Sequence, residues 1–150
     1  MTRLLVDTSV VIKWFHVEGE AEVLESRAIR AAHLREDLQA HVIELAFYEV
    51  GNVLIRALQW AADDVADQLH DLEANVGPPL VLTLPMLRDA ALIAGQHPLS
   101  FYDASWAAAA VALETTLVSA DRRLLDEGLA ESPSAVVRRM ALPMPPISPR

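Results

Sequence analysis

The sequence contains no cysteine, which excludes disulfide bonds, thiolate catalysis and cysteine-based zinc sites. It also has no apolar run near the roughly 18 residues of a membrane span. The short apolar stretch after Met1 is interrupted by Asp7 and Lys13, unlike a secretory signal. There is neither a glycine-rich phosphate loop nor the strand–Gly-x-Ser-x-Gly–helix elbow of serine hydrolases. These absences predict a soluble, cytoplasmic protein and argue against triad hydrolysis.

Positive charge is also scarce. The net charge is −9, and Lys13 is the only lysine among the 12 basic residues. This balance argues against broad, sequence-independent adhesion to nucleic acid, which usually needs a basic face. It remains compatible with a nuclease, because a metal site needs local negative charge and a few arginines can contact phosphates.

Histidine clusters with metal-ligand spacing are absent too. We therefore interpret the histidines as surface or structural residues: His16, His33, His41, His70 and His97.

What is present is enough apolar sequence for one core. The hydrophobic fraction is 53% of 150 residues, which predicts a single domain over 1–142, followed by a loose, proline-rich tail over 143–150. Apolar runs predict strands at 3–7, 40–43, 80–83 and 116–119, with 135–138 as a candidate edge strand. Helical patterns lie between them, over about 21–38, 45–60, 63–76, 85–95 and 103–114. This alternation predicts an α/β fold with a mostly parallel sheet covered on both faces by helices.

Four acidic residues lie where this fold would bring them to one sheet edge. Asp7 and Asp121 follow predicted strands, Asp103 begins an alanine-rich helix, and Glu49 lies off the apolar stripe of its helix. Ligands collect at the carboxyl ends of parallel strands, and gathered carboxylates favour a hard cation such as Mg²⁺ or Mn²⁺. Taken singly, each acid also has an ordinary explanation as a helix cap, a turn residue or a solvated side chain.

Four segments resemble, in order, the motifs of PIN-domain proteins, and most closely those of the small VapC-type toxin ribonucleases. They are Val6-Asp7-Thr8-Ser9, Tyr48-Glu49-Val50-Gly51-Asn52-Val53-Leu54, Phe101-Tyr102-Asp103-Ala104 and Leu117-Val118-Ser119-Ala120-Asp121-Arg122-Arg123-Leu124. The resemblance implies an α/β/α sandwich whose acids Asp7, Glu49, Asp103 and Asp121 bind Mg²⁺ or Mn²⁺ and hydrolyse RNA. It further implies support from Ser119, a homodimer and inhibition by a cognate antitoxin protein.

Several neighbouring residues have a functional and a structural interpretation. Ser9 and Ser119 are expected to support the acids by hydrogen bonding. Arg122 and Arg123 are candidates for binding an RNA phosphate or an antitoxin carboxylate, with a structural ion pair as the alternative. Glu44 is an additional acid that we expect to be exposed.

Aromatic residues raise a similar question. Trp14, Phe15 and Val17 are candidates for an antitoxin groove beside the helix that carries Val23 and Leu24, although core packing is the simpler expectation for Trp14. Packing is also expected for the other two tryptophans, Trp60 and Trp106.

Two other functions stay open at this point. Asp7 could be the nucleophile of a phosphatase or phosphotransferase, but position 9 is Ser9 where the common Asp-x-Asp hydrolases have a second aspartate. Alternatively, the chain is a catalytically idle RNA-binding or interaction domain. The presence of an acid at all four matching positions argues against that loss of activity.

Overall fold

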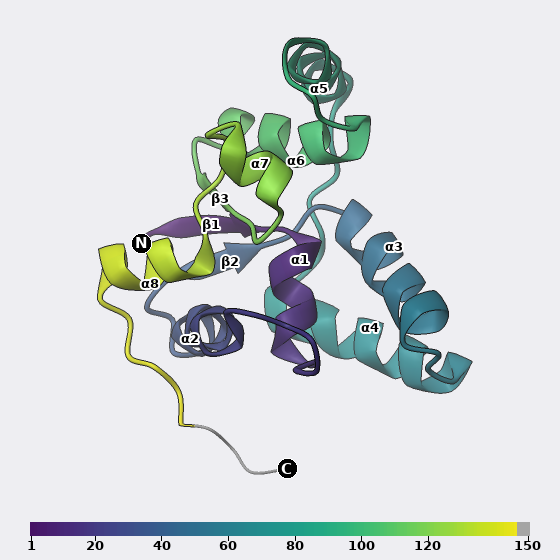
Figure 1. The fold of residues 1–150 in the computed structure, drawn as a ribbon, viewed down its shortest axis with the longest axis vertical. Helices are drawn as coiled ribbons and strands as arrows, with labels where there is room; N and C mark the ends of the chain where they lie inside the picture. Colours follow the sequence, from purple (N-terminus) through teal and green to yellow (C-terminus); the bar gives the residue numbers. More distant parts are fainter. Residues whose placement is uncertain (147–150) are drawn as a thin grey trace.

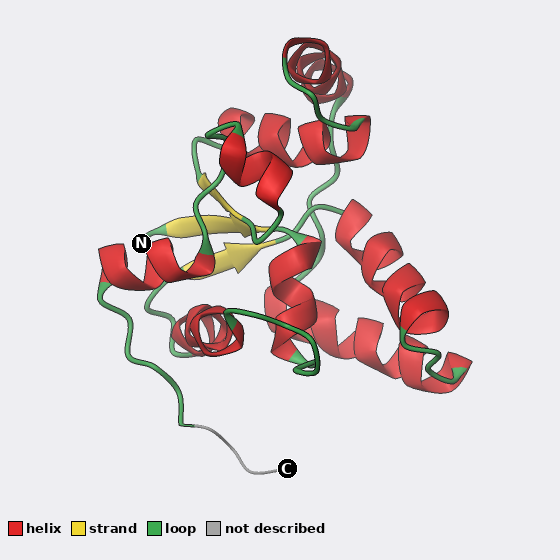
Figure 2. Ribbon diagram, in the orientation of Figure 1, coloured by secondary structure: helices red, strands yellow, loops and turns green. Residues whose placement is uncertain are grey.

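The computed structural model describes residues 1–146, and its centre is a three-stranded parallel sheet in the order β2-β1-β3. The strands are β1 (Arg3–Val6), β2 (Gln39–His41) and β3 (Thr116–Val118). In β1, Leu4, Leu5 and Val6 are completely buried, as expected for the middle strand of a covered parallel sheet. In Figure 2 the yellow strands lie at the centre with red helices around them, which confirms the α/β prediction.

Helices fill the connections between and beyond the strands (Figure 1). α6 packs against β3, and α2 packs against β2 and α8. None of the helices within residues 1–146 combines the length and the apolar character needed to cross a membrane. The helices are α1 (Thr8–Val11), the 3₁₀ turn η1 (Ile12–Trp14), α2 (Val23–Leu34), α3 (Leu45–Asn52), the π-helical η2 (Val53–Ala57), α4 (Ala62–Val76), α5 (Leu84–Gln96), α6 (Phe101–Ala112), α7 (Arg122–Asp126) and α8 (Pro133–Met140).

The parallel register brings the carboxyl ends of β1 and β3 to the same level. Val6 lies opposite Val118, and the Asp7 amide continues the ladder by donating to the Val118 carbonyl at 3.1 Å. The arrowheads of β1 and β2 point toward α1 and α3 in Figure 1. Residues that follow the strands therefore gather at the edge of the sheet from which these helices start.

The strand predicted at 80–83 is wrong. Only Leu80 pairs with another strand-like segment, through a single bridge to Ile43. Val81 is 69% exposed, and Thr83 begins α5 by accepting a hydrogen bond from the Met86 amide. The apolar run is short because its last residue is used as a helix cap.

The edge strand predicted at 135–138 is also wrong, because these residues belong to α8. The Ser132 hydroxyl accepts a hydrogen bond from the Ala135 amide, and Pro133 occupies the first turn. Proline has its φ angle preset for this position, so this pair starts a helix despite the two adjacent valines. Residues 143–146 of the predicted tail form neither helix nor strand, and 147–150 lie outside the described residues.

The helix predicted over 45–60 is interrupted rather than continuous. It changes from α3 to the π-helical η2 at Val53, where the Leu58 amide donates to the Val53 carbonyl five residues earlier. π-helical turns are rare and occur frequently at functional sites. Here the change in winding falls directly after Asn52, on the helix that carries Glu49.

Candidate active site

Two of the four acids cap helices that start at strand ends. Asp7 precedes α1 and accepts a hydrogen bond from the Ser9 amide at 3.0 Å. Asp121 precedes α7 and accepts one from the Arg123 amide at 2.9 Å. Each carboxylate is thus fixed by the helix that it begins, and the parallel pairing of β1 with β3 places the two caps beside each other.

The other two acids lie on helices that meet this edge. Glu49 lies in the middle of α3, and Asp103 lies in the first turn of α6, which Ser100 caps, so Asp103 does not itself begin the helix. A cavity of about 260 Å³ brings all four acids together. Its lining residues are Asp7, Thr8, Ser9, Glu49, Asn52, Val53, Asp103, Trp106, Asp121 and Arg123.

Ser9 and Ser119 support the acids, as predicted. The Ser9 hydroxyl donates to Asp7 Oδ1 and accepts from the Ala120 amide at 2.9 Å, so it joins the segments after β1 and β3. The Ser119 hydroxyl accepts from the Asp121 amide at 2.9 Å and lies 3.4 Å from the Ser9 hydroxyl. The two serines therefore hold the strand ends, and with them the two caps, in one arrangement.

Sequence reasoning missed two residues that orient Glu49. The Thr8 hydroxyl and the Trp106 indole both donate to Glu49 Oε1, at 3.0 and 3.2 Å. Trp106 is only 2% exposed, so the packing prediction is confirmed, but its nitrogen also serves the site. Its position three residues after Asp103, on the same face of the helix, is the signal that could have revealed it.

Among the described residues, the hydrogen bonds with full geometry to Asp7 and Glu49 end on one oxygen of each carboxylate. Both hydrogen bonds to Asp7 end on Oδ1, and both to Glu49 end on Oε1. Asp103 Oδ2 is buried with no hydrogen-bond partner among the described residues. It lies 3.5 Å from Arg123 Nη2, close enough for ion pairing but without hydrogen-bond geometry. Among the described residues, Glu49 Oε2 and Asp103 Oδ2 therefore accept no hydrogen bond and remain available for a ligand.

Asp121 differs because Arg123 engages both of its oxygens. The guanidinium donates from Nη2 to Oδ2 at 3.0 Å and from Nε to Oδ1 at 3.3 Å. The structural ion pair considered for Arg123 is therefore present, and it involves two of the four acids. Arg122, in contrast, points to Asp126 at 3.7 Å and does not line the cavity.

Burial and mutual repulsion disfavour charge on three of the four acids. Desolvation, with a smaller contribution from Glu49, raises the pKa of Asp7 from 3.8 to about 6, although hydrogen bonds from serines oppose the shift. Desolvation likewise raises the pKa values of Glu49 and Asp103. The pKa of Asp121 is lowered because Arg123 donates hydrogen bonds to it. Without a further cation, the cavity holds negative charge at an energetic cost.

The donor set fits a hard divalent cation. Mg²⁺ and Mn²⁺ prefer carboxylate oxygens, and the unpartnered Asp103 Oδ2 is a buried acceptor of that kind. Within residues 1–146, however, no three His, Asp or Glu side chains converge closely enough to hold a metal as they stand. Two of the four acids, Asp121 and Asp103, are instead paired with the guanidinium of Arg123.

The remaining predicted positions are structural. Glu44 is exposed, as expected, and accepts a hydrogen bond from the Tyr48 hydroxyl at 3.3 Å. His33 bridges the Ala40 amide and the Asn75 carbonyl, and His97 pairs with Glu127 at 2.9 Å. These two histidines tie separate segments together and take no part in the cavity.

The aromatic surface considered for a partner is only partly formed. Trp14 is 8% exposed and donates its indole N–H to the Ser26 carbonyl at 2.9 Å, which confirms core packing. Phe15 packs edge-on against Trp60, with 6.2 Å between ring centroids. A hollow of about 230 Å³ adjoins Trp14 and Phe15, but α4 lines its other side, and Val17, Val23 and Leu24 do not line it.

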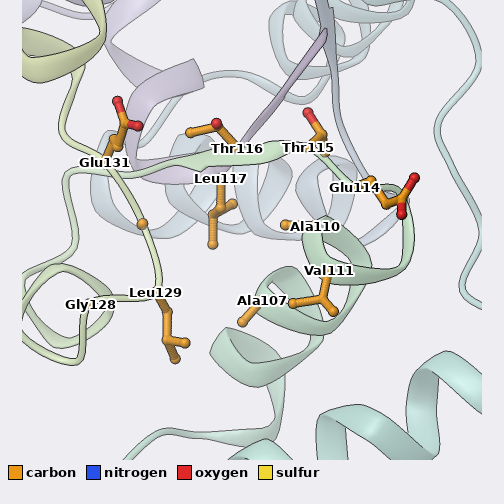
Figure 3. A pocket seen from close by; sticks show the side chains of 11 residues that line it. Ala107, Ala110, Val111, Glu114, Thr115, Thr116, Leu117, Gly128, Leu129 and Glu131 are labelled. Atoms are coloured by element: carbon orange, nitrogen blue, oxygen red, sulfur yellow. The ribbon is translucent and has the colours of Figure 1, made fainter. Parts of the chain in front are cut away.

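A second hollow lies at the outer edge of β3, between α6 and the segment around Leu129 (Figure 3). Its volume is about 290 Å³, and most of its side chains are apolar. The carboxylates of Glu114 and Glu131 lie at opposite ends of the view. This hollow contains none of the four acids.

Known proteins resemble this chain over most of its length. Ribonuclease VapC3 of Pyrobaculum aerophilum is 27% identical over 129 residues, covering 83% of this chain and 94% of the relative. The crystal structure of PAE2754 from the same organism covers 93% of this chain and 97% of its own, with 28% identity and a TM-score of 0.64.

A structure described as a toxin-antitoxin complex from Klebsiella pneumoniae shares the fold, with a TM-score of 0.61 and 15% identity over 87% of this chain and 97% of its own. These likenesses confirm the expected sheet flanked by helices. The model of the PIN domain matches residues 4–127, which include all four acids, and the protein therefore belongs to the PIN domain family.

Proposed function

We propose that the protein is a metal-dependent endoribonuclease that acts in the cytoplasm as the toxin of a type II toxin–antitoxin pair. The observation that carries this proposal is the cavity that four carboxylates from separate parts of the chain line together. The PIN domain match and the ribonuclease VapC3 relative support RNA as the substrate. The toxin role follows from the resemblance of the four motifs to VapC-type proteins.

Asp7, Glu49, Asp103 and Asp121 are the residues that would hold Mg²⁺ or Mn²⁺. Such an ion, when bound, activates water and offsets charge on the phosphate and on the leaving oxygen. The protein's part is to orient the carboxylates. Ser9 fixes one oxygen of Asp7, and Thr8 and Trp106 fix one oxygen of Glu49.

Arg123, which lines the cavity, and its neighbour Arg122 provide contacts for RNA. The side chains of Arg122 and Arg123 are 84% and 64% exposed, directly after the capping residue Asp121. A guanidinium matches a phosphate with two parallel hydrogen bonds, and a few such contacts are enough to position a substrate on an acidic protein. We propose that both side chains contact the RNA backbone.

The phosphatase alternative is weaker in this geometry. A nucleophilic carboxylate must reach a phosphorus atom, but Asp7 is 4% exposed and Ser9 donates two hydrogen bonds to its Oδ1. The idle-domain alternative has one observation in its favour, because Arg123 already neutralises part of the acidic cluster.

Cleavage of a defined RNA separates these functions. We expect the purified protein to cut RNA with Mg²⁺ or Mn²⁺ and to stop in EDTA, with no hydrolysis of a phosphomonoester under either condition. Asp7→Asn and Asp103→Asn should remove cleavage while the protein stays folded. Asp63→Asn changes an exposed acid outside the cavity and is the matched control. Normal cleavage by a folded Asp7→Asn protein would contradict the assigned role.

We also propose a homodimer, in which the outer face of α5 contacts a second copy. Ala90 is the only fully buried residue of this helix, whereas Leu84 and Leu92 are 81% and 55% exposed. Arg88 and Asp89 lie between the two leucines. In a two-fold contact between antiparallel copies, each leucine meets the other and the opposite charges can pair. Light scattering should find a dimer for the parent and a monomer for Leu92→Asp.

The cognate antitoxin is the other proposed partner. The hollow beside Trp14 and Phe15 could accept an apolar side chain of an antitoxin segment. Co-expression of the chain with the antitoxin, followed by a pull-down with Phe15→Ala as the variant, tests this contact. Undiminished binding by that variant would place the antitoxin elsewhere.

A further inference from the structure

Within residues 1–146, Arg123 is the only basic residue that lines the carboxylate cavity. Its guanidinium lies 3.0 Å from Asp121 and 3.5 Å from Asp103, which belong to different elements. No described residue gives Asp7 or Glu49 such a counter-charge, and their hydrogen bonds come from neutral serine, threonine and tryptophan donors. The positive charge of the cavity is therefore concentrated on the side formed by α6 and α7.

We infer that Arg123 is a built-in competitor of the divalent cation: it neutralises Asp121 and Asp103 in the metal-free protein, and metal binding must release these carboxylates from its guanidinium. This inference rests on the proposed function, since it assigns Arg123 a part in loading the same site. It also accounts for the lack of convergence among the acids, because the side chains that a metal would draw together are held to an arginine instead.

Two features make release feasible. The Arg123 side chain is 64% exposed, so its guanidinium can turn into solvent without disturbing the core. The backbone amide of Arg123 keeps its own hydrogen bond to Asp121 Oδ1, which does not depend on the side chain. The start of α7 should therefore survive when the guanidinium leaves or is removed.

The adjacent Arg122 provides a matched control. It has the same charge and lies on the same helix, but it pairs with Asp126 outside the cavity. A general effect of net charge on cation binding would be similar for Arg122→Gln and Arg123→Gln. Competition at the site would be confined to Arg123→Gln.

The experiment is calorimetric titration of Mn²⁺ into the metal-free full chain, without RNA, for the parent and for Arg123→Gln, Arg123→Lys and Arg122→Gln. We expect Arg123→Gln to bind Mn²⁺ about two to five times more tightly, the range that corresponds to loss of exposed ion pairs. Arg123→Lys should fall between this variant and the parent, because an ammonium group lacks the paired donors. Arg122→Gln should match the parent.

If the parent binds Mn²⁺ and Arg123→Gln binds it equally or more weakly, the inference that Arg123 competes with the cation is overturned. The proposed function is left intact by that result. An equal gain in Arg122→Gln would overturn the inference as well, because the effect would then be one of net charge. Absence of Mn²⁺ binding in all four proteins would overturn both the inference and the metal-dependent function. Melting curves in EDTA confirm that the variants compared are folded.

Discussion

The buried carboxylate of Asp7 should make the metal-free protein less stable as the pH rises. Its pKa is about 6 in the folded chain, against 3.8 for the ordinary group. A folded-state pKa above the unfolded value gives stability that is fully present below pH 3.8 and is lost as the pH rises through about 6. Replacing Asp7 with asparagine removes this dependence and keeps an oxygen that can accept from Ser9.

The pKa shift of Asp7 determines how much the free energy of unfolding changes with pH. One pKa unit corresponds to about 1.4 kcal/mol, so the full effect is about 3 kcal/mol, of which about 2 kcal/mol falls between roughly pH 4.5 and 7.5. For a chain of this size, that difference corresponds to about 4–8 °C in melting temperature. Burial of the extra amide group in Asp7→Asn adds an offset, but the offset is the same at every pH and cancels when the slopes are compared.

The assay is urea unfolding in EDTA at several pH values. We expect the unfolding free energy of the parent to fall by about 2 kcal/mol more than that of Asp7→Asn as the pH rises over this range. Asp126→Asn, which changes an exposed acid, should follow the parent. If the unfolding free energies of the parent and Asp7→Asn change with pH in parallel, the argument that burial of the Asp7 carboxylate causes the pH dependence is refuted.

Three further substitutions test the surroundings of the acids. Ser9→Ala leaves the Ala120 amide without its acceptor and should lower the unfolding free energy by about 1–2 kcal/mol, measured by urea unfolding. Trp106→Phe removes a donor that favours ionised Glu49, so the pH profile of cleavage should shift to higher pH; an unchanged profile would contradict this. Glu49→Gln should abolish metal-dependent cleavage while Glu44→Gln leaves it unchanged, because Glu44 is exposed outside the cavity.

The sequence alone predicts the elements whose signals are continuous. The apolar runs of β1 and β3 and the repeating core positions of α4 identify these elements correctly. The strand predictions at 80–83 and 135–138 were wrong, because two or three β-branched or apolar residues cannot outweigh a well-formed helix start. Thr83 and Ser132, each followed within two positions by a proline, are the stronger signals.

The proximity of Asp7 and Asp121 could be predicted because it follows from topology. Parallel strands bring Asp7 and Asp121 together wherever the connecting helices lie. The pairing of Arg123 with two acids could not be predicted, since a side-chain rotamer decides it. The indole bond from Trp106 to Glu49 depends on the angle between α3 and α6, which sequence spacing does not specify.

The cavity has two unequal halves, because neutral donors hold the acids on one side and the exposed Arg123 pairs with those on the other. On the side of β1 and α3, the carboxylates of Asp7 and Glu49 lost their rotational freedom when the chain folded, so capture of an ion there costs little further entropy. On the side of α6 and α7, the guanidinium of Arg123 must first move. When a cation binds, the carboxylates of Asp7 and Glu49 should therefore stay in place, and the side chains on α6 and α7 should rearrange around it.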